Sequence, residues 1–350
     1  MQKKRPTALP WIPAAGVLSM LSLLLFPDLA ANAARDAMTL SVTRLIPLLF
    51  PYSVLSSLMI RRKWLPERGL LSILYGLPGD CEGVLFSGIA AGFPVGAEGS
   101  ARLLRDGSVS REDAGRLAAV SSVPSPAFLA GAVGSMWGDV RFGWFLWIAA
   151  NLTLLLFSRL TGRKSKSPAS AHLNQTPVPP PSSFSRDFSR SVTDAAGSCL
   201  AVTAFVAFFR ILCAVGTALL PAARLPLTLF LEFSSGVKTG AEAGGICGAA
   251  MTGVSAGFGG LSVLSQIAAR NADDLPGGGF SLKPYLISRM LLAAVLGSAA
   301  ALWASFFSLE AASSVFLDPP VPLSSAVPVL GALLLLRIPH FFGRRAAVDE

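Results

Sequence analysis

The sequence predicts an all-α protein that crosses a membrane several times, and three observations support this fold class. Hydrophobic residues make up 52% of the 350 residues and charged residues only 14%, whereas soluble domains carry about 25% charged residues. The apolar residues form long runs, and a helix needs roughly 20 of them to cross the hydrocarbon layer. The net charge of +9 comes from short basic clusters between these runs. This pattern is typical of cytoplasmic loops and argues against binding to nucleic acid.

Six apolar runs are predicted to cross the membrane as helices. In chain order they are 9–26, 38–60, 142–158, 195–220, 290–309 and 319–336. The first run follows a basic cluster and precedes Ala31-Asn32-Ala33, so a cleavable signal peptide is its alternative; its length favours a retained helix. Two runs contain an arginine, Arg44 and Arg210, which must reach the interface or face the bundle interior, because a guanidinium in lipid costs at least about 3 kcal/mol.

Basic clusters predict the orientation of the chain. They precede the first run, follow the second run, occupy residues 160–190 and end the tail. Lys and Arg accumulate in cytoplasmic loops, so all four clusters and both termini are predicted to be cytoplasmic in a cell membrane. Residues 160–190 also contain Pro168, Pro177 and Pro179–Pro181, and such a tract does not pack a core. It predicts a linker between membrane halves at 1–159 and 191–350.

The two predicted halves share a motif. Ser87–Phe93 recurs as Thr252–Phe258, with the glycines, the second alanine and the phenylalanine identical. Glycine- or proline-interrupted segments at matching positions of duplicated halves are typical of a transporter binding site, because unwound backbone inside a membrane leaves N–H and C=O groups for a solute. The alternative is close helix packing through Gly92-x-x-x-Gly96, Gly244-x-x-x-Gly248 and Gly253-x-x-x-Gly257. Whether the halves are inverted stays open, although the charge bias argues against simple inversion.

The residues of the two interrupted segments and the polar residues within the apolar stretches are the candidates for solute binding. The full set is Gly92, Phe93, Pro94, Glu98, Ser125, Glu232, Lys238, Gly257, Phe258, Ser262 and Gln266. Structural alternatives exist for several of them. Lys238 and Glu242 are four residues apart and can pair along a helix, Ser262 and Gln266 can make ordinary interhelical contacts, and Pro124-Ser125-Pro126 can kink a packed helix.

An arginine-rich loop follows the first motif. It contains Arg102, Arg105, Arg111 and Arg116 among acidic residues. Ser110 and Asp113 have the spacing of a capping box that starts a helix. We expect a solvated cytoplasmic helix here rather than a ligand site.

Catalytic and metal-binding motifs do not support an enzyme. Gly253-Val254-Ser255-Ala256-Gly257 matches a nucleophile elbow, which needs a strand-to-helix turn and a histidine partner. His172 lies in the linker and His340 in the tail. The cysteines stand singly, without Cys-x-x-Cys spacing. We therefore expect no enzymatic activity, no cofactor and no metal.

Several separated motifs resemble one family. In the first half they are residues 92–97, 110–117, 125–128 and 131–134; in the second they are 231–236, 260–263 and Gln266. Together they are similar to the YlbJ-like sporulation integral membrane proteins, over about residues 40–305. The resemblance implies two gate-like halves with broken or re-entrant helices, related to the nucleoside-recognition gate domain, in an endospore-forming bacterium. Glu98 departs from the family, which often has a basic residue at this position.

These observations lead to two hypotheses of function. The first is a transporter or permease-like protein that moves or senses a small, nucleoside-like solute during sporulation. The second is a non-transporting scaffold that uses the arginine-rich loop and the linker as contacts. The expected partners are the lipid bilayer, a small solute, sporulation membrane proteins and copies of the chain itself.

Overall fold

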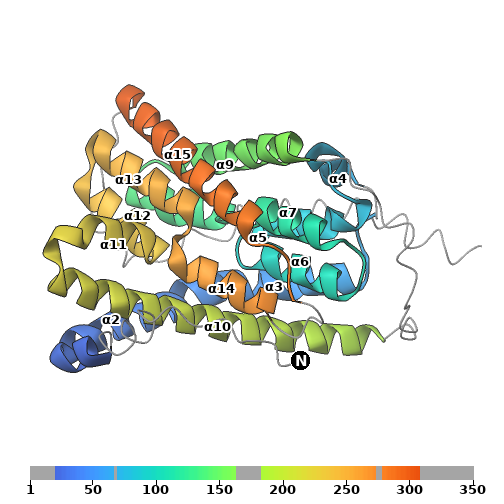
Figure 1. Ribbon diagram of the computed structural model, residues 1–350, viewed down its shortest axis with the longest axis horizontal. Coiled ribbons are helices and arrows are strands. Elements are labelled where there is room, and N and C mark those ends of the chain that lie inside the picture. The colour runs from blue at the N-terminus through green and yellow to red at the C-terminus, as the bar shows by residue number, and fades with distance from the viewer. Residues whose placement is uncertain (1–19, 67–68, 163–182, 273–277, 308–350) are drawn as a thin grey trace, which may run out of the picture. The chain divides into compact units, whose positions relative to one another are not determined.

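The computed structural model describes residues 20–66, 69–162, 183–272 and 278–307, and in these ranges every regular element is a helix (Figure 1). Four helical segments are long and apolar enough to cross a membrane: Val140–Thr161, Phe184–Leu219, Gly245–Asn271 and Lys283–Phe306. The prediction of an all-α polytopic membrane protein is confirmed. The runs 9–26 and 319–336 lie outside the described residues.

Residues 27–61 form one continuous helical stretch. Helix α2 (Pro27–Leu40) passes through a π-helical turn, Ser41–Leu45, into α3 (Ile46–Arg61). The predicted run 38–60 lies within this stretch, which is not among the four segments of spanning length. Arg44 is in the π-helical turn, and its side chain is outside the described part.

Short helices follow in the first half. They are α4 (Leu70–Tyr75), α5 (Glu82–Ala91), α6 (Val95–Arg105), α7 (Arg111–Ser121), a π-helical segment Ala127–Val133, α8 (Gly134–Met136) and α9 (Val140–Thr161). The chain breaks between α5 and α6 at Gly92, whose φ is +81°. A Cβ at this position would lie 2.6 Å from the Ser125 nitrogen and 2.8 Å from the Val123 oxygen. Both the backbone angle and the close approach require glycine here.

The second half contains longer helices. They are α10 (Phe184–Leu219), α11 (Arg224–Phe230), α12 (Phe233–Ala243), α13 (Gly245–Phe258), α14 (Gly260–Ala272) and α15 (Lys283–Phe306). The predicted runs 142–158 and 195–220 fall on α9 and α10, and 290–309 overlaps α15. Long α10 lies along α2, α3 and α14, while α15 packs against α13, α7 and α9 (Figure 1). Helices of the two predicted halves therefore pack within one compact unit.

Small residues bring α13 and α15 together. A Cβ on Gly257 would lie 2.5 Å from the Leu292 carbonyl oxygen, and one on Gly253 would overlap the Leu296 carbonyl oxygen. Close packing is therefore what the structure shows for the Gly253-x-x-x-Gly257 pair. Large apolar side chains on the outer surfaces are exposed instead, among them Leu200 and Phe208 of α10, as expected for faces that contact lipid.

The expectation of a solvated helix at residues 111–121 is wrong. The Ser110 hydroxyl accepts a hydrogen bond from the Asp113 N–H at 3.1 Å, so the predicted cap is present. However, α7 is buried from Asp113 to Ser121. Arg116 is only 6% exposed, and it donates to the carbonyls of Gly76 and Ser158 and pairs with Asp113. Carbonyls at neighbouring helix ends and Asp113 thus hold a cation for which the sequence pattern predicts contact with water, although its Nε has no hydrogen-bond partner in the described part of the chain.

Candidate functional site

The breaks after the two shared motifs have matching surroundings. At the first, the Phe93 N–H donates to the Val123 carbonyl at 3.0 Å. At the second, Gly259 and Gly260 have φ values of +81° and +80°, and the Ser262 N–H donates to the Leu231 carbonyl at 3.1 Å. In each half, the break that follows the motif therefore lies against a second break.

Aromatic rings join these two break regions. The ring centroids of Phe93 and Phe233 are 5.3 Å apart, and those of Phe128 and Phe233 are 4.5 Å apart. A Cβ on Gly259 would lie 3.7 Å from the Phe93 ring. Edge and tilted contacts at these distances are favourable. The first break thus meets the start of α12 through packed rings and lies next to Gly259 of the second break.

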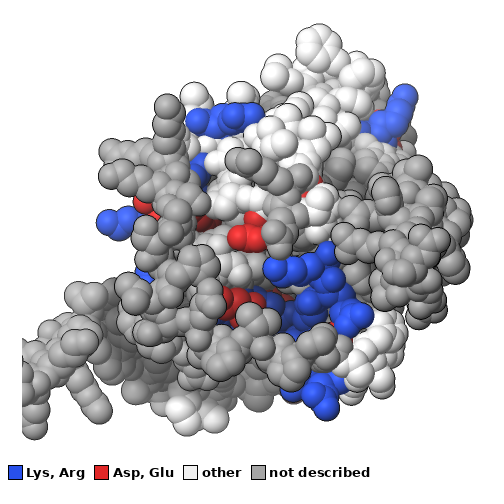
Figure 2. Space-filling model, turned by 90° about the vertical axis from the view of Figure 1, so that its right-hand side faces the viewer, with Lys and Arg blue, Asp and Glu red and all other residues white. Residues whose placement is uncertain are grey.

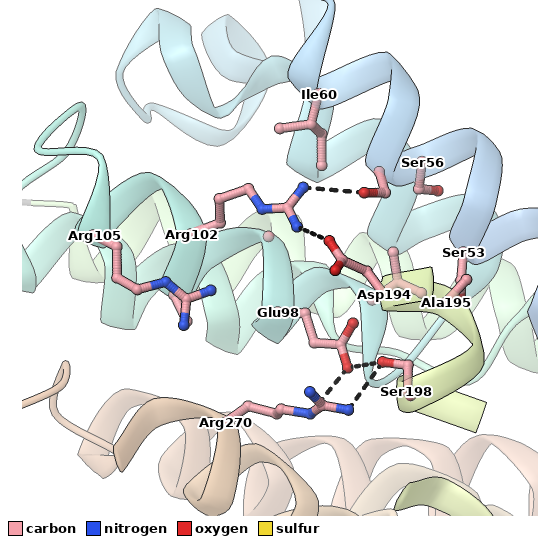
Figure 3. A pocket seen from close by; sticks show the side chains of 15 residues that line it. Ser53, Ser56, Ile60, Glu98, Arg102, Arg105, Asp194, Ala195, Ser198 and Arg270 are labelled. Carbon is pink, nitrogen blue, oxygen red and sulfur yellow. Dashed lines mark hydrogen bonds and ion pairs between the residues drawn. The ribbon is translucent and has the colours of Figure 1, made fainter. Parts of the chain in front are cut away.

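A polar pocket of about 320 Å³ lies beside this junction, between α3, α6, α10 and α14 (Figure 3). It starts at Val95, directly after Pro94, and extends along α6 to Arg105. Its lining residues are Ser53, Ser56, Ser57, Ile60, Val95, Glu98, Gly99, Ala101, Arg102, Arg105, Asp194, Ala195, Gly197, Ser198 and Arg270. The pocket is therefore built from both predicted halves of the chain.

One ion-pair cluster in the pocket centres on Glu98. Arg270 Nε of α14 is 3.3 Å from Glu98 Oε1 of α6, and Arg270 Nη2 donates to Ser198 Oγ of α10 at 3.2 Å. The Ser198 hydroxyl in turn donates to Glu98 Oε1. Arg270 thus brings a cation to Glu98 from another helix.

A second cluster centres on Asp194 of α10. Its Oδ2 lies 2.5 Å from Arg61 Nη2 and 2.9 Å from Arg102 Nη2, and Arg102 Nη1 donates to Ser57 Oγ at 3.1 Å. Arg105 also lines the pocket and has no ion-pair or hydrogen-bond partner among the described residues (Figure 3). The lining thus contains three guanidinium groups and two carboxylates, which leaves an excess of one positive charge. Arg61, which pairs with Asp194 from beside the lining, adds a second.

In each half, the helix that follows the shared motif ends with basic residues. Arg102 and Arg105 lie in the last turn of α6, and Arg270 lies in the last turn of α14. The helix that follows each motif therefore ends at the same pocket. Figure 2 shows Lys and Arg side chains gathered on the side where α9 ends and α10 begins, with acidic side chains among them.

Glu232 lies in a different environment from Glu98. It is 1% exposed and caps α12, accepting hydrogen bonds from the N–H groups of Ser234 and Ser235 at 3.1 and 2.8 Å and from both hydroxyls. Arg210 Nε is 3.8 Å from its Oε2. Arg210 thus faces the bundle interior, one of the two placements predicted for it. Glu232 does not line the pocket.

Other predicted residues have structural partners. Lys238 pairs with Glu242 at 3.7 Å, and both side chains are about half exposed, 48% and 52%. The Phe258 ring contacts Phe230 at 5.1 Å. Ser125 Oγ accepts from the Phe128 N–H at 3.2 Å. Pro94 caps α6.

Two candidates near the second break are buried. Ser262 is 1% and Gln266 5% exposed, and the Ser262 hydroxyl has no hydrogen-bond partner in the described part of the chain. Gly257 packs against α15, as described above. Of the eleven candidates, Glu98 lines the pocket, whereas Gly92, Phe93, Ser125 and Ser262 belong to the joined breaks.

Sequence reasoning missed most of the pocket. The sequence pattern predicts that Arg102 lies in a solvated segment, and it does not single out Asp194, Ser198 or Arg270. A helical signal was present, because Glu98, Arg102 and Arg105 are spaced four and three apart and share one helix face. Asp194 and Ser198 are likewise four apart. Nothing in these spacings tells which helices face one another.

Arg289 was missed as well. It is 1% exposed and belongs to α15. Its Nη1 and Nη2 donate to the carbonyls of Ser122 and Ala119 at 2.5 and 2.9 Å, and its guanidinium lies 5.0 Å from the centre of the Tyr285 ring. A cation at a helix C-terminus is favourable. Arg289 therefore stabilises the end of α7, where the first break region begins.

Known proteins offer one informative likeness. The "Sporulation integral membrane protein YlbJ" of Bacillus subtilis (strain 168) is 30% identical over 149 residues, 40% of this chain and 36% of that protein. This likeness to a membrane protein agrees with the four helices of spanning length, because both indicate a location in the membrane. The chain is a multi-pass membrane protein. The matched part of this chain covers well under half of the relative's length. No protein-family model matches this chain, and no solved structure matches it.

Proposed function

We propose that this membrane protein moves or senses a small solute at the charged pocket and the adjoining broken helices, and that it acts during spore formation. The observation that carries the proposal is the position of the pocket. It begins directly after the first break, is lined by both predicted halves, and adjoins the junction where the two break regions meet. Solute sites of transporters commonly lie between repeats, beside discontinuous helices.

The chemistry of the pocket supports this proposal. Charged side chains inside a membrane protein are costly and mark solute or ion pathways by default. The Glu98–Arg270 and Asp194–Arg102 pairs each join two helices, so a solute that competes for one partner changes how these helices are held together. We place the basic end in the cytoplasm, following the excess of Lys and Arg there.

Uptake into proteoliposomes tests the transport proposal. We expect one class of nucleoside, amino acid or inorganic ion to enter, and Arg270→Gln to lower its rate by at least about tenfold, or about 1.4 kcal/mol in the barrier. Lys238→Gln is the matched control, because this exposed cation pairs outside the pocket. Absence of flux for all classes, or an Arg270→Gln rate equal to that of the control, contradicts the proposal.

The role in sporulation is supported by the name of the relative. In a spore-forming host that carries the gene, we expect deletion to lower the count of heat-resistant spores, and the wild-type gene to restore it. Arg270→Gln protein that inserts normally into the membrane is expected to restore the count poorly. Full restoration by this variant contradicts a transport role in sporulation and favours the scaffold.

The scaffold hypothesis relies on the arginine-rich loop and the linker as contact surfaces. Arg102 and Arg116 make contacts within the fold, so the loop offers less free charge than the sequence indicates. Residues 163–182 of the linker lie outside the described part. Within the described residues, no specific contact surface therefore favours the scaffold over transport.

A further inference from the structure

We propose that the pocket binds an oxyanion, namely a phosphate group or a carboxylate carried by a small molecule. The inference rests on the proposed function, because it names the class of solute for the same pocket. It uses the three arginines of the lining, Arg102 and Arg105 of α6 and Arg270 of α14. Arg61 of α3 adds a cation beside them, where it pairs with Asp194.

The charge balance is the first argument. Asp194 is shared by Arg61 and Arg102, and Glu98 pairs with Arg270. The lining therefore has three guanidinium groups and two carboxylates, and Arg61 adds a fourth guanidinium where it pairs with Asp194 beside the lining. Arg105 has no partner in the described part of the chain. Confined charges of one sign raise the local concentration of the opposite ion. An anion carrying one or two negative charges neutralises this excess, whereas a cation increases it.

The hydrogen-bond donors are the second argument. A guanidinium presents five N–H donors in a planar fork, which matches the oxygen geometry of phosphates and carboxylates. The Arg105 guanidinium donates to no described residue, and Arg102 and Arg270 each hold only part of their donors in the contacts above. Figure 3 shows Arg102, Arg105 and Arg270 around the same pocket, with serine hydroxyls on its opposite wall.

The volume and position of the pocket are the third argument. Its volume of about 320 Å³ lies at the small end of ligand pockets, which range from about 300 to 1,000 Å³. The pocket also lies at the end of the helices where basic side chains gather (Figure 2). The same oxyanion chemistry is offered by a soluble phosphate and by the headgroup of an anionic lipid, so the experiment separates these two sources.

Calorimetry with inorganic phosphate tests the proposal directly. The full chain is placed in nanodiscs of phosphatidylcholine, and phosphate is titrated at low salt, where charge interactions are least screened. We expect saturable binding that Arg105→Gln weakens by at least about tenfold, as for the loss of a charged hydrogen bond. Glu98→Gln is expected to tighten binding, because it removes a competing carboxylate. Arg35→Gln is the matched control, since Arg35 is exposed and bonds to Asn32.

A second set of nanodiscs contains phosphatidylglycerol. If the headgroup is the source, this lipid suppresses phosphate binding and co-purifies with wild-type protein but not with Arg105→Gln. If a soluble anion is the source, phosphate binding is unchanged. Both results support an oxyanion site. The proposal is overturned if neither phosphate nor this lipid binds, or if Arg105→Gln and Arg35→Gln bind alike while both variants melt as wild type does.

These experiments distinguish a failure of the oxyanion-site proposal from a failure of the transport proposal. Saturable phosphate binding without flux of any solute supports the oxyanion site and contradicts the transport proposal. Flux of an uncharged solute without phosphate binding retains transport and overturns the oxyanion site.

Discussion

Glu98, which is half-buried, and Glu232, which is buried, have different roles in this fold. Glu232 is satisfied where it stands, because four donors of Ser234 and Ser235 converge on it. Glu98 is satisfied only through two other helices, by Arg270 and Ser198. A carboxylate held by its own helix start is suited to stabilise that helix. One held across helices is suited to respond to a ligand.

Removal of the Glu232 carboxylate is expected to destabilise the protein. Glu232→Ala deletes the cap of α12 and leaves Arg210 without its carboxylate, and the loss of one partner of a buried pair costs about 3 kcal/mol. Thermal unfolding in detergent measures the change. Glu242→Ala is the control, because the exposed Lys238–Glu242 pair is worth less than about 1 kcal/mol. Equal melting temperatures for the two variants contradict the assigned role.

At the scale of elements, glycine serves two purposes that the sequence pattern alone does not separate. Gly92 and Gly259 have positive φ angles and end helices at the breaks. Gly253 and Gly257 are helical, and their missing side chains admit α15. Both shared motifs therefore pack closely, because Gly88 of the first motif likewise lies against the Ser121 carbonyl of α7. They differ in the position of the break, which comes at Gly92 within the first motif and at Gly259 after the second.

Substitution of Gly257 tests this packing. We expect Gly257→Ala to lower the stability by roughly 1–3 kcal/mol, because overpacking displaces α15. Gly197→Ala is the control, because Gly197 lies within α10 and a Cβ there meets nothing within 4 Å. Its substitution is expected to raise stability slightly, since alanine favours a helix interior. Chemical or thermal unfolding gives both changes, and a stability loss shared by both variants argues against the specific contact.

At the scale of the whole molecule, the predicted orientation of the chain in the membrane can be tested through a single cysteine. Cys247 alone among the four cysteines is exposed. It lies near one end of the spanning segment Gly245–Asn271, whereas Arg270 of the pocket lies at the other end. Because the basic end is predicted to be cytoplasmic, Cys247 is expected to face outward.

Labelling with a membrane-impermeant maleimide measures this orientation. Intact cells are expected to label the wild type but not Cys247→Ser. Arg105→Cys in the Cys247→Ser background is expected to react only after the membrane is permeabilised. The reverse pattern shows that the basic end faces outward, and the proposed orientation is then wrong.

Much of the fold was readable from local pattern. Runs 142–158 and 195–220 lie within α9 and α10, the Ser110 cap is present, and the chain breaks at Gly92–Pro94 as predicted. Each of these depends on residues adjacent in sequence. The sequence does not predict the buried state of α7, because Arg116 donates to the carbonyls of Gly76 and Ser158, which are 40 and 42 residues away in sequence.

Membrane class and the positions of helices and breaks follow from composition and short spacing, since apolar length, glycine and proline act within a few turns of chain. The charged pocket required the fold, because Glu98, Asp194 and Arg270 come from three helices that are far apart in sequence. Opposite charges attract only across short distances, and which helix faces meet is settled by packing of the entire bundle.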